Sequence, residues 1–172
     1  MITLLIDGRS GSGKTELAAA IAGGWAEAQL VHLDDIYPGW HGLEAASALV
    51  PQIISGLRWR RWDWATGSHR EWHDLDPARP LIVEGCGALT RAARARATFG
   101  IWVECPDELR KARAISREPS FEPHWQEWTA QEETFIAAER PRELADAIVD
   151  GTDVTNDIAR WRAMLDPARV EE

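Results

Sequence analysis

An eight-residue motif near the start of the chain restricts its fold more than any other feature of the sequence. Residues 8–15 read Gly-Arg-Ser-Gly-Ser-Gly-Lys-Thr, a full match to the pattern Gly-x-x-x-x-Gly-Lys-[Ser/Thr]. An apolar run at residues 2–6 precedes the motif and is typical of a strand that is buried on both faces. Residues 14–25 carry alanine, leucine and isoleucine at helical spacing. The chain is therefore expected to begin with a strand, a tight glycine-rich turn and a helix.

This turn has the composition of a phosphate-binding loop. Glycine adopts backbone conformations that other residues avoid, so successive N–H groups can converge on phosphate oxygens at the positive end of a helix dipole. Lys14 is expected to neutralise the β and γ phosphates of a nucleoside triphosphate, and Thr15 to offer its hydroxyl to Mg²⁺. The loop residues expected to bind the nucleotide are Gly8, Ser10, Gly11, Ser12, Gly13, Lys14 and Thr15. The alternative is a flexible glycine turn without a ligand.

The rest of the chain alternates between short apolar strands and helices, which implies a parallel sheet in a single α/β domain over residues 1–172. Further strands are expected at residues 29–33, 80–83, 98–103 and 147–150. Further helices are expected at residues 42–56, 107–118, 122–140 and 156–165. The expected fold class is thus α/β, with a parallel five-stranded sheet flanked by helices.

One stretch, residues 57–76, interrupts this alternation. It contains two aromatic, alternating runs around a Gly-containing turn, which is typical of a β-hairpin inserted between sheet strands. Four tryptophans lie in it: Trp59, Trp62, Trp64 and Trp72. Because a solvent-facing insertion with so many indole rings would expose a large apolar area, we expect the hairpin to cover part of a ligand site.

Charge and composition exclude several classes of protein. The chain has 28 acidic and 19 basic residues and a formal charge of -9, so nucleic acid is not an expected partner. No apolar run approaches the roughly 20 residues of a membrane span, and a membrane partner is not expected either. The two cysteines are too few for a disulfide framework, which fits a cytoplasmic protein. We expect a monomer or a homodimer.

Acidic residues follow two of the expected strands, at the edge where open α/β sheets bind ligands. Asp34 and Asp35 end the second strand, and Tyr37 follows closely. A carboxylate at this edge could accept the proton of a substrate hydroxyl while that oxygen attacks a γ-phosphate. Glu84 ends the third strand, where it could hold a metal or a substrate hydroxyl. Helix capping or turn formation is the alternative role of these acids.

The phosphate-binding motif, Asp34-Asp35-Ile36-Tyr37 and Ile82-Val83-Glu84-Gly85 resemble, in order and spacing, the uridine kinase-like group of P-loop kinases, which includes nicotinamide riboside kinases. The resemblance covers roughly the first 120 residues and implies a P-loop fold that transfers a phosphoryl group to a small molecule. An Asp-x-Phe-Tyr element in that group implies Asp34 as the base, with Asp35 as second choice, and Tyr37 as a substrate contact. Trp62-Asp63 resembles an element that binds sugar hydroxyls, which implies Asp63 as a substrate-binding residue.

The segment from Arg110 to Glu118 resembles the arginine-rich lid helix of the same group. Arg110, Arg113 and Arg117 share one face of the expected helix 107–118, so their guanidiniums could converge on a transferring phosphoryl group. The resemblance implies catalytic roles for Arg113 and Arg117 and nucleotide binding by Arg110. The alternative is a solvated helix face paired with neighbouring acids.

Two further signals are open to more than one interpretation. Trp125 and Trp128, three residues apart on the expected helix 122–140, could close over a substrate, although such pairs more often pack a helix against its neighbour. The turn at residues 150–152 could contact adenine through backbone atoms or be a plain turn.

These features predict ATP- and Mg²⁺-dependent phosphoryl transfer to a hydroxyl of a small molecule, with a nucleoside or a nucleoside-like molecule as the first expectation. An Asn-Lys-x-Asp element, which would indicate guanine, is absent from the sequence. A phosphate-bearing acceptor, received by Arg58, Arg60 and Arg61, is a second hypothesis. A third is an ATP-dependent binding module whose tryptophan-rich hairpin docks a partner. A requirement for an added acceptor would separate the enzymes from the module.

Overall fold

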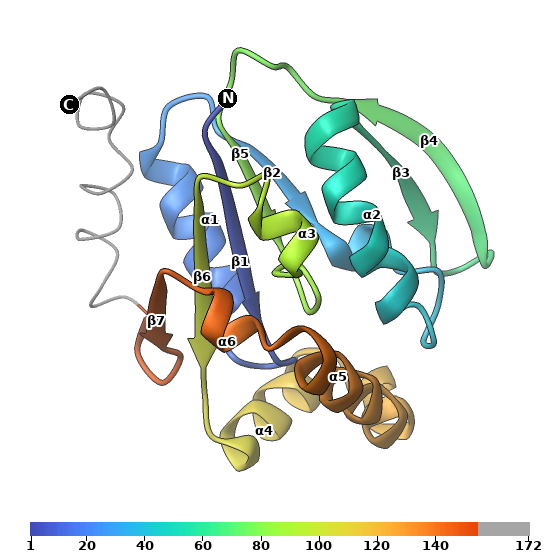
Figure 1. The fold of residues 1–172 in the computed structure, drawn as a ribbon. Helices are drawn as coiled ribbons and strands as arrows, with labels where there is room; N and C mark the ends of the chain where they lie inside the picture. Colours follow the sequence, from blue (N-terminus) through green and yellow to red (C-terminus); the bar gives the residue numbers. More distant parts are fainter. Residues whose placement is uncertain (155–172) are drawn as a thin grey trace.

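The computed structural model describes residues 1–154, and the helix expected at residues 156–165 lies outside this range. Its main sheet consists of β1 (Thr3–Gly8), β2 (Gln29–His32), β5 (Leu81–Glu84), β6 (Phe99–Glu104) and β7 (Ala147–Asp150). The strands lie in the order β2-β5-β1-β6-β7, and all neighbours are parallel (Figure 1). The predicted parallel five-stranded sheet is therefore confirmed.

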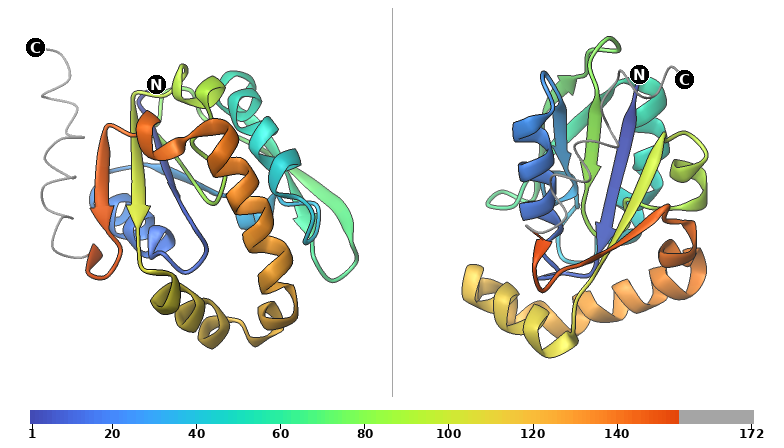
Figure 2. Two further views of the ribbon diagram at one scale, coloured as in Figure 1. Left: turned by 60° about the horizontal axis from the view of Figure 1, so that its bottom comes forward. Right: turned by 90° about the vertical axis from the view of Figure 1, so that its left-hand side faces the viewer.

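Helices cover both faces of this sheet, as the two views of Figure 2 show. One face packs against α1 (Lys14–Gly24), and the other against α2 (Leu43–Gly56) and the short α3 (Arg91–Arg94). Beyond the carboxyl ends of the strands lie α4 (Asp107–Arg117) and α5 (Trp125–Glu139), after which α6 (Pro141–Leu144) leads into β7. None of the helices within residues 1–154 is long and apolar enough to cross a membrane.

The central strand β1 divides the core into two layers. Every residue of β1 is buried, and its side chains alternate between the two faces, as the pleat of a strand requires. Leu4 and Ile6 pack on the side of Leu17 and Ile21 from α1, while Leu5 packs with the α2 side. The loop that follows β1 is thereby fixed at the middle of the carboxyl edge of the sheet.

The interruption at residues 57–76 is an antiparallel pair of strands, β3 (Arg58–Asp63) and β4 (Ser68–Asp74), that lies beside α2 (Figure 1). Trp59 is buried against the core, whereas Trp72 is 54% exposed. At the tip of the hairpin, the indole Nε1 of Trp64 donates a hydrogen bond to the backbone oxygen of Asp34 (2.8 Å). The tip therefore touches the residues that follow β2.

The helix expected at residues 122–140 begins later than predicted. Residues 119–124 form a 3-10 helix, η2 (Pro119–His124), and the α-helix starts at Trp125. Pro123 lacks a backbone N–H, so it fits the tighter first turns but not the interior of an α-helix. The four-residue helices α3 and α6 were not predicted, because one helical turn is too short to show a period.

Candidate active site

The phosphate-binding motif forms a loop between β1 and α1. Gly11 and Gly13 have backbone φ angles of 77° and 96°, in the left-handed region that favours glycine. The N–H of Leu17 donates to the Gly13 carbonyl (3.0 Å), so the preceding amides of the first turn of α1 have no partner within the helix. They lie at a cavity of about 360 Å³. This phosphate cavity is lined by Gly11, Gly13, Lys14, Thr15, Glu16, Arg113 and Arg117.

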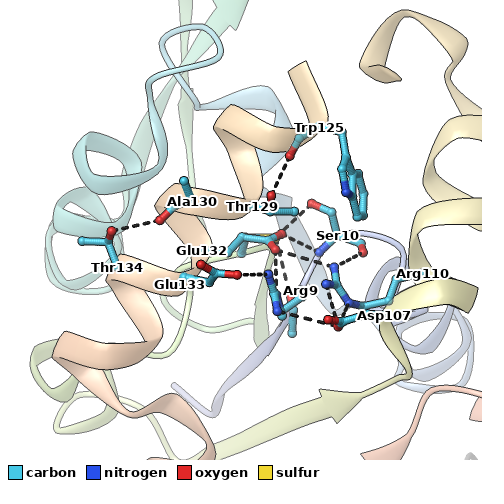
Figure 3. A network of polar contacts seen from close by, with 12 residues as sticks. Arg9, Ser10, Asp107, Arg110, Trp125, Thr129, Ala130, Glu132, Glu133 and Thr134 are labelled. Carbon is cyan, nitrogen blue, oxygen red and sulfur yellow. Dashed lines mark hydrogen bonds and ion pairs between the residues drawn. The ribbon is translucent and has the colours of Figure 1, made fainter. Parts of the chain in front are cut away.

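The loop is held from behind by a buried carboxylate of α5 (Figure 3). Glu132 is 2% exposed, and it accepts the backbone N–H of Ser10 (2.7 Å) and the Nε of Arg9 (2.9 Å). Arg110, also 2% exposed, donates to the Ser10 carbonyl (3.2 Å) and lies 3.6 Å from Glu132. The loop is thus clamped to α4 and α5 by a network that sequence analysis did not find.

Arg110 does not occupy the place expected of a nucleotide-binding residue. Its guanidinium is buried in this network, pairs with Asp107 (2.8 Å) and lies over the Trp125 ring at 5.4 Å. It does not line the phosphate cavity. The spacing from Trp125 through Trp128 to Glu132 places the acid on the same buried helix face as the tryptophans, and this was the signal that could have identified Glu132.

The other two arginines of α4 do reach the phosphate cavity. Arg113 donates to the carbonyls of Gly151 (2.6 Å) and Thr152 (3.3 Å), so it ties the cavity to the turn after β7. Among residues 1–154, Arg117 has no hydrogen bond or ion pair that holds it to one position. Its guanidinium is therefore available to a ligand.

A second cavity, of about 290 Å³, lies next to the first. Five aromatic residues line it: Tyr37, Trp40, Trp64, Phe121 and Trp128. The remaining lining residues are polar or charged: Ser10, Lys14, Asp34, Arg117, Glu118 and Ser120. We call it the aromatic cavity. Lys14 and Arg117 line both cavities, so the two spaces meet at these cations.

Asp34 lies in the short 3-10 helix η1 (Leu33–Asp35) and faces the aromatic cavity. Although its side chain reaches solvent, surrounding protein desolvates the carboxylate and raises the pKa of Asp34 above its ordinary value, while Lys14 opposes this shift. Asp35 does not line the cavity. Of the two expected bases, the structure brings only Asp34 to the junction with Lys14.

Glu84 lies beside Thr15 at the phosphate loop. Its Oε1 accepts a hydrogen bond from the Thr15 hydroxyl (3.1 Å). The same oxygen also pairs with Nδ1 of His32 at 2.6 Å. The hydrogen bond to Glu84 raises the pKa of His32 and outweighs the effect of burial. His32 was not among the residues predicted for the site, although it lies directly opposite Glu84 in the pairing of β2 with β5.

Thr15 and Glu84 fit a magnesium ion. The second carboxylate oxygen of Glu84, Oε2, is buried and has no hydrogen-bond partner within residues 1–154. Oxygen ligands of this kind are those that Mg²⁺ prefers. The part of the chain that the structure describes holds no group of three or more His, Cys, Asp or Glu side chains suited to a metal, so these residues would share the ion with bound phosphates.

Two expected substrate contacts are placed differently. Tyr37 is 1% exposed and its hydroxyl donates to the Cys86 carbonyl (2.8 Å), so only its ring borders the aromatic cavity. Asp63 does not line that cavity. Its carboxylate accepts the Ala65 N–H (3.0 Å) and pairs with Arg70 (2.7 Å) within the hairpin.

Trp125 and Trp128 of α5 were expected either to close over a substrate or to pack the helix against its neighbour. Trp125 is 9% exposed and packs edge-on against Phe121, with ring centroids 5.5 Å apart. Trp128, 4% exposed, packs in the same core but also lines the aromatic cavity. Packing therefore accounts for both residues, and Trp128 also borders the ligand space.

Solved structures of several kinases resemble the chain. No protein-family model and no curated protein matches it. A possible uridine kinase from Bacillus stearothermophilus has a TM-score of 0.57 and 20% identity, over 87% of this chain and 88% of its own. A shikimate kinase from Bacteroides thetaiotaomicron has a TM-score of 0.60 and 14% identity, over 95% of this chain and 98% of its own. A sugar kinase from Janibacter sp. HTCC2649 has a TM-score of 0.61 and 19% identity, over 99% of this chain and 97% of its own. The chain therefore has the fold of P-loop kinases, as its motifs predicted.

Proposed function

We propose that the protein transfers the γ-phosphoryl group of ATP to a hydroxyl group of a small molecule. The observation that carries this proposal is the meeting of the phosphate cavity and the aromatic cavity at Lys14 and Arg117, with Asp34 on the acceptor side. A phosphoryl group that moves from one cavity to the other passes these two cations, which stabilise its charge.

The residues divide the reaction between them. Loop amides and Lys14 bind the triphosphate, and the acceptor hydroxyl lies beside Asp34. As the acceptor oxygen forms its bond to the γ-phosphorus, the bond from that phosphorus to the bridging oxygen breaks and ADP leaves with the electron pair. Asp34 takes the hydroxyl proton, and its raised pKa makes it a stronger base than an ordinary aspartate.

Thr15 and Glu84 are the residues that would hold Mg²⁺. When bound, the ion neutralises charge on the β and γ phosphate oxygens. His32 keeps the Glu84 carboxylate in place through its 2.6 Å contact with Oε1. The other oxygen, Oε2, has no hydrogen-bond partner within residues 1–154 and would be the one to contact the ion.

Two other functions receive less support from the geometry. A phosphate-bearing acceptor would need Arg58, Arg60 and Arg61, but none of them lines the aromatic cavity. Arg58 and Arg60 lie over the Trp72 ring, and Arg61 pairs with Glu71 (2.7 Å). A binding module would present the hairpin tip to a partner, whereas the indole N–H of Trp64 at that tip donates to the backbone oxygen of Asp34 and its ring lines the aromatic cavity.

ADP formation from MgATP, measured with and without a panel of hydroxyl compounds, tests the proposal. Lys14→Ala serves as the blank. We expect Asp34→Asn to lower kcat by about a hundredfold or more while ATP affinity, measured by calorimetry, stays within a few-fold of the wild-type value. Asp74→Asn, an exposed hairpin acid, is the control and retains activity. Equal turnover of Asp34→Asn and the wild type would refute the base assignment, and ADP formation indifferent to every acceptor would favour the binding module.

A further inference from the structure

We propose that the acceptor is an amino alcohol, with the hydroxyl that is phosphorylated at one end and a positively charged nitrogen in the aromatic cavity at the other. This inference rests on the proposed function and narrows its acceptor. It is carried by the arrangement of the rings that border the aromatic cavity and by the sign of the charges around that cavity.

Several pairs of the rings that border the aromatic cavity meet at steep angles, whereas Trp40 and Phe121 are stacked. Trp40 and Trp64 have centroids 5.0 Å apart at 60°, and Trp40 and Trp128 lie 6.3 Å apart at 86°. Tyr37 meets Trp128 at 76° and 4.8 Å. Within residues 1–154, Trp64 and Trp128 have no stacked ring partner, so these two rings can attract a compact cation.

A flat heterocycle, such as a nucleoside base, is bound differently. It stacks on a free aromatic face or slides between two parallel rings, which requires a gap of two stacking distances. The parallel partners of Trp40 leave no such gap, because Phe121 lies 5.2 Å away at 20° and His124 lies 4.2 Å away at 10°. Phe121 and His124 therefore occupy stacking positions on Trp40 that a flat ligand would need.

The charges in the aromatic cavity also favour a cation. Among the residues of the range 1–154 that line it, the positive side chains are Lys14 and Arg117, and both face the phosphate cavity as well. Once ATP is bound, its phosphates neutralise these two. What remains is the pair of carboxylates Asp34 and Glu118.

The carboxylate of Glu118 is held in place by Ser120. Its Oε1 accepts both the backbone N–H (3.2 Å) and the hydroxyl (2.6 Å) of Ser120, and these bonds lower the pKa of Glu118 and keep it ionised. The net charge of -9 adds a long-range attraction for positively charged molecules.

Pairs of acceptors that differ only in charge test the inference. Choline is compared with 3,3-dimethylbutan-1-ol, ethanolamine with propan-1-ol, and glucosamine with glucose, with uridine as a neutral nucleoside. We expect kcat/KM in at least one pair to be tenfold or more higher for the cation than for its neutral counterpart. A second measurement needs no turnover: the protein's tryptophan fluorescence is titrated with tetramethylammonium chloride against sodium chloride at equal ionic strength, and we expect saturation with the former alone.

Matched variants locate the effect. Trp64→Leu and Glu118→Gln are each expected to reduce the preference for the cation at least threefold, whereas Trp64→Phe, which keeps a ring, and Glu122→Gln, an exposed acid of η2 outside the cavity, retain it. Phosphorylation of neutral acceptors or uridine without any preference for a cation overturns the inference and leaves the proposed function standing. Failure of every acceptor to stimulate ADP formation counts against the proposed function. Saturable binding of tetramethylammonium that Trp64→Leu weakens still supports the cation site in that case, and its absence overturns the site.

Discussion

The clamp between the phosphate loop and α5 makes a quantitative prediction for Glu132→Gln. The substitution preserves the shape of the side chain and one acceptor oxygen for the Ser10 N–H. It removes the negative charge and places an amide N–H₂ where an oxygen accepts from Arg9. The side chain is 2% exposed, so water cannot replace what is lost.

The loss of stability expected for Glu132→Gln follows from the partners that Arg110 keeps. This guanidinium is 2% exposed and keeps one other carboxylate partner, Asp107, whose side chain is 76% exposed and strongly screened. Removing one member of a buried ion pair typically costs about 3–5 kcal/mol, because the other charge stays buried without compensation. For a chain of this length that corresponds to a melting temperature lowered by roughly 10 °C.

Urea unfolding of Glu132→Gln beside Glu133→Gln is the assay. Glu133 is the next residue along α5 and lies 3.6 Å from Arg9, but its side chain is 70% exposed, so its loss should cost about 0–1 kcal/mol. We also expect weaker ATP binding by Glu132→Gln in calorimetry, because the Ser10 segment of the loop loses its anchor. A cost for Glu132→Gln no larger than that for Glu133→Gln would refute the reasoning.

Two further predictions concern pH and the arginine at the junction of the cavities. Burial raises the pKa of Asp7 from its ordinary value of 3.8 to about 7, and three backbone N–H bonds only partly oppose this. Since the folded protein holds this proton more tightly than the unfolded chain, the contribution of Asp7 to the free energy of unfolding should fall as pH rises from about 4 to about 7. Asp7→Asn should remove this contribution from the pH dependence measured in urea titrations at several pH values, and an unchanged pH dependence would contradict it. Arg117→Ala should lower kcat by about a hundredfold or more with a smaller change in the KM for ATP, while Lys111→Ala, exposed on the same helix and outside both cavities, should retain the wild-type rate in the ADP assay.

The parts of the fold that sequence analysis predicted correctly are those encoded by neighbouring residues. The phosphate motif, the strand before it and the helix after it are one continuous segment, and the apolar strands are short runs that a parallel sheet buries on both faces. The start of α5 was less accurate, because Pro123 is compatible with the first turns of a helix and the sequence alone does not show that these turns are 3-10.

The parts that were missed depend on contacts between distant segments. Helical spacing correctly placed Arg110, Arg113 and Arg117 on one side of α4, but it does not show what packs against each of them. In the structure α5 covers Arg110, the turn after β7 binds Arg113, and the two cavities receive Arg117. Three residues with the same periodicity therefore have three different surroundings, which only the tertiary structure reveals.

The phosphate cavity and the aromatic cavity are built from different parts of the chain, and this difference affects how acceptor specificity could change. The phosphate cavity is built mainly from one contiguous motif, so its chemistry can be predicted from residues 8–15 alone. The aromatic cavity takes Trp40 from a loop, Trp64 from the hairpin, Phe121 from η2 and Trp128 from α5. Because these walls come from separate segments, a substitution in one of them can alter acceptor recognition while the phosphate loop and its clamp stay unchanged. Acceptor preference should therefore respond to mutation in the hairpin tip or η2 more readily than ATP affinity does.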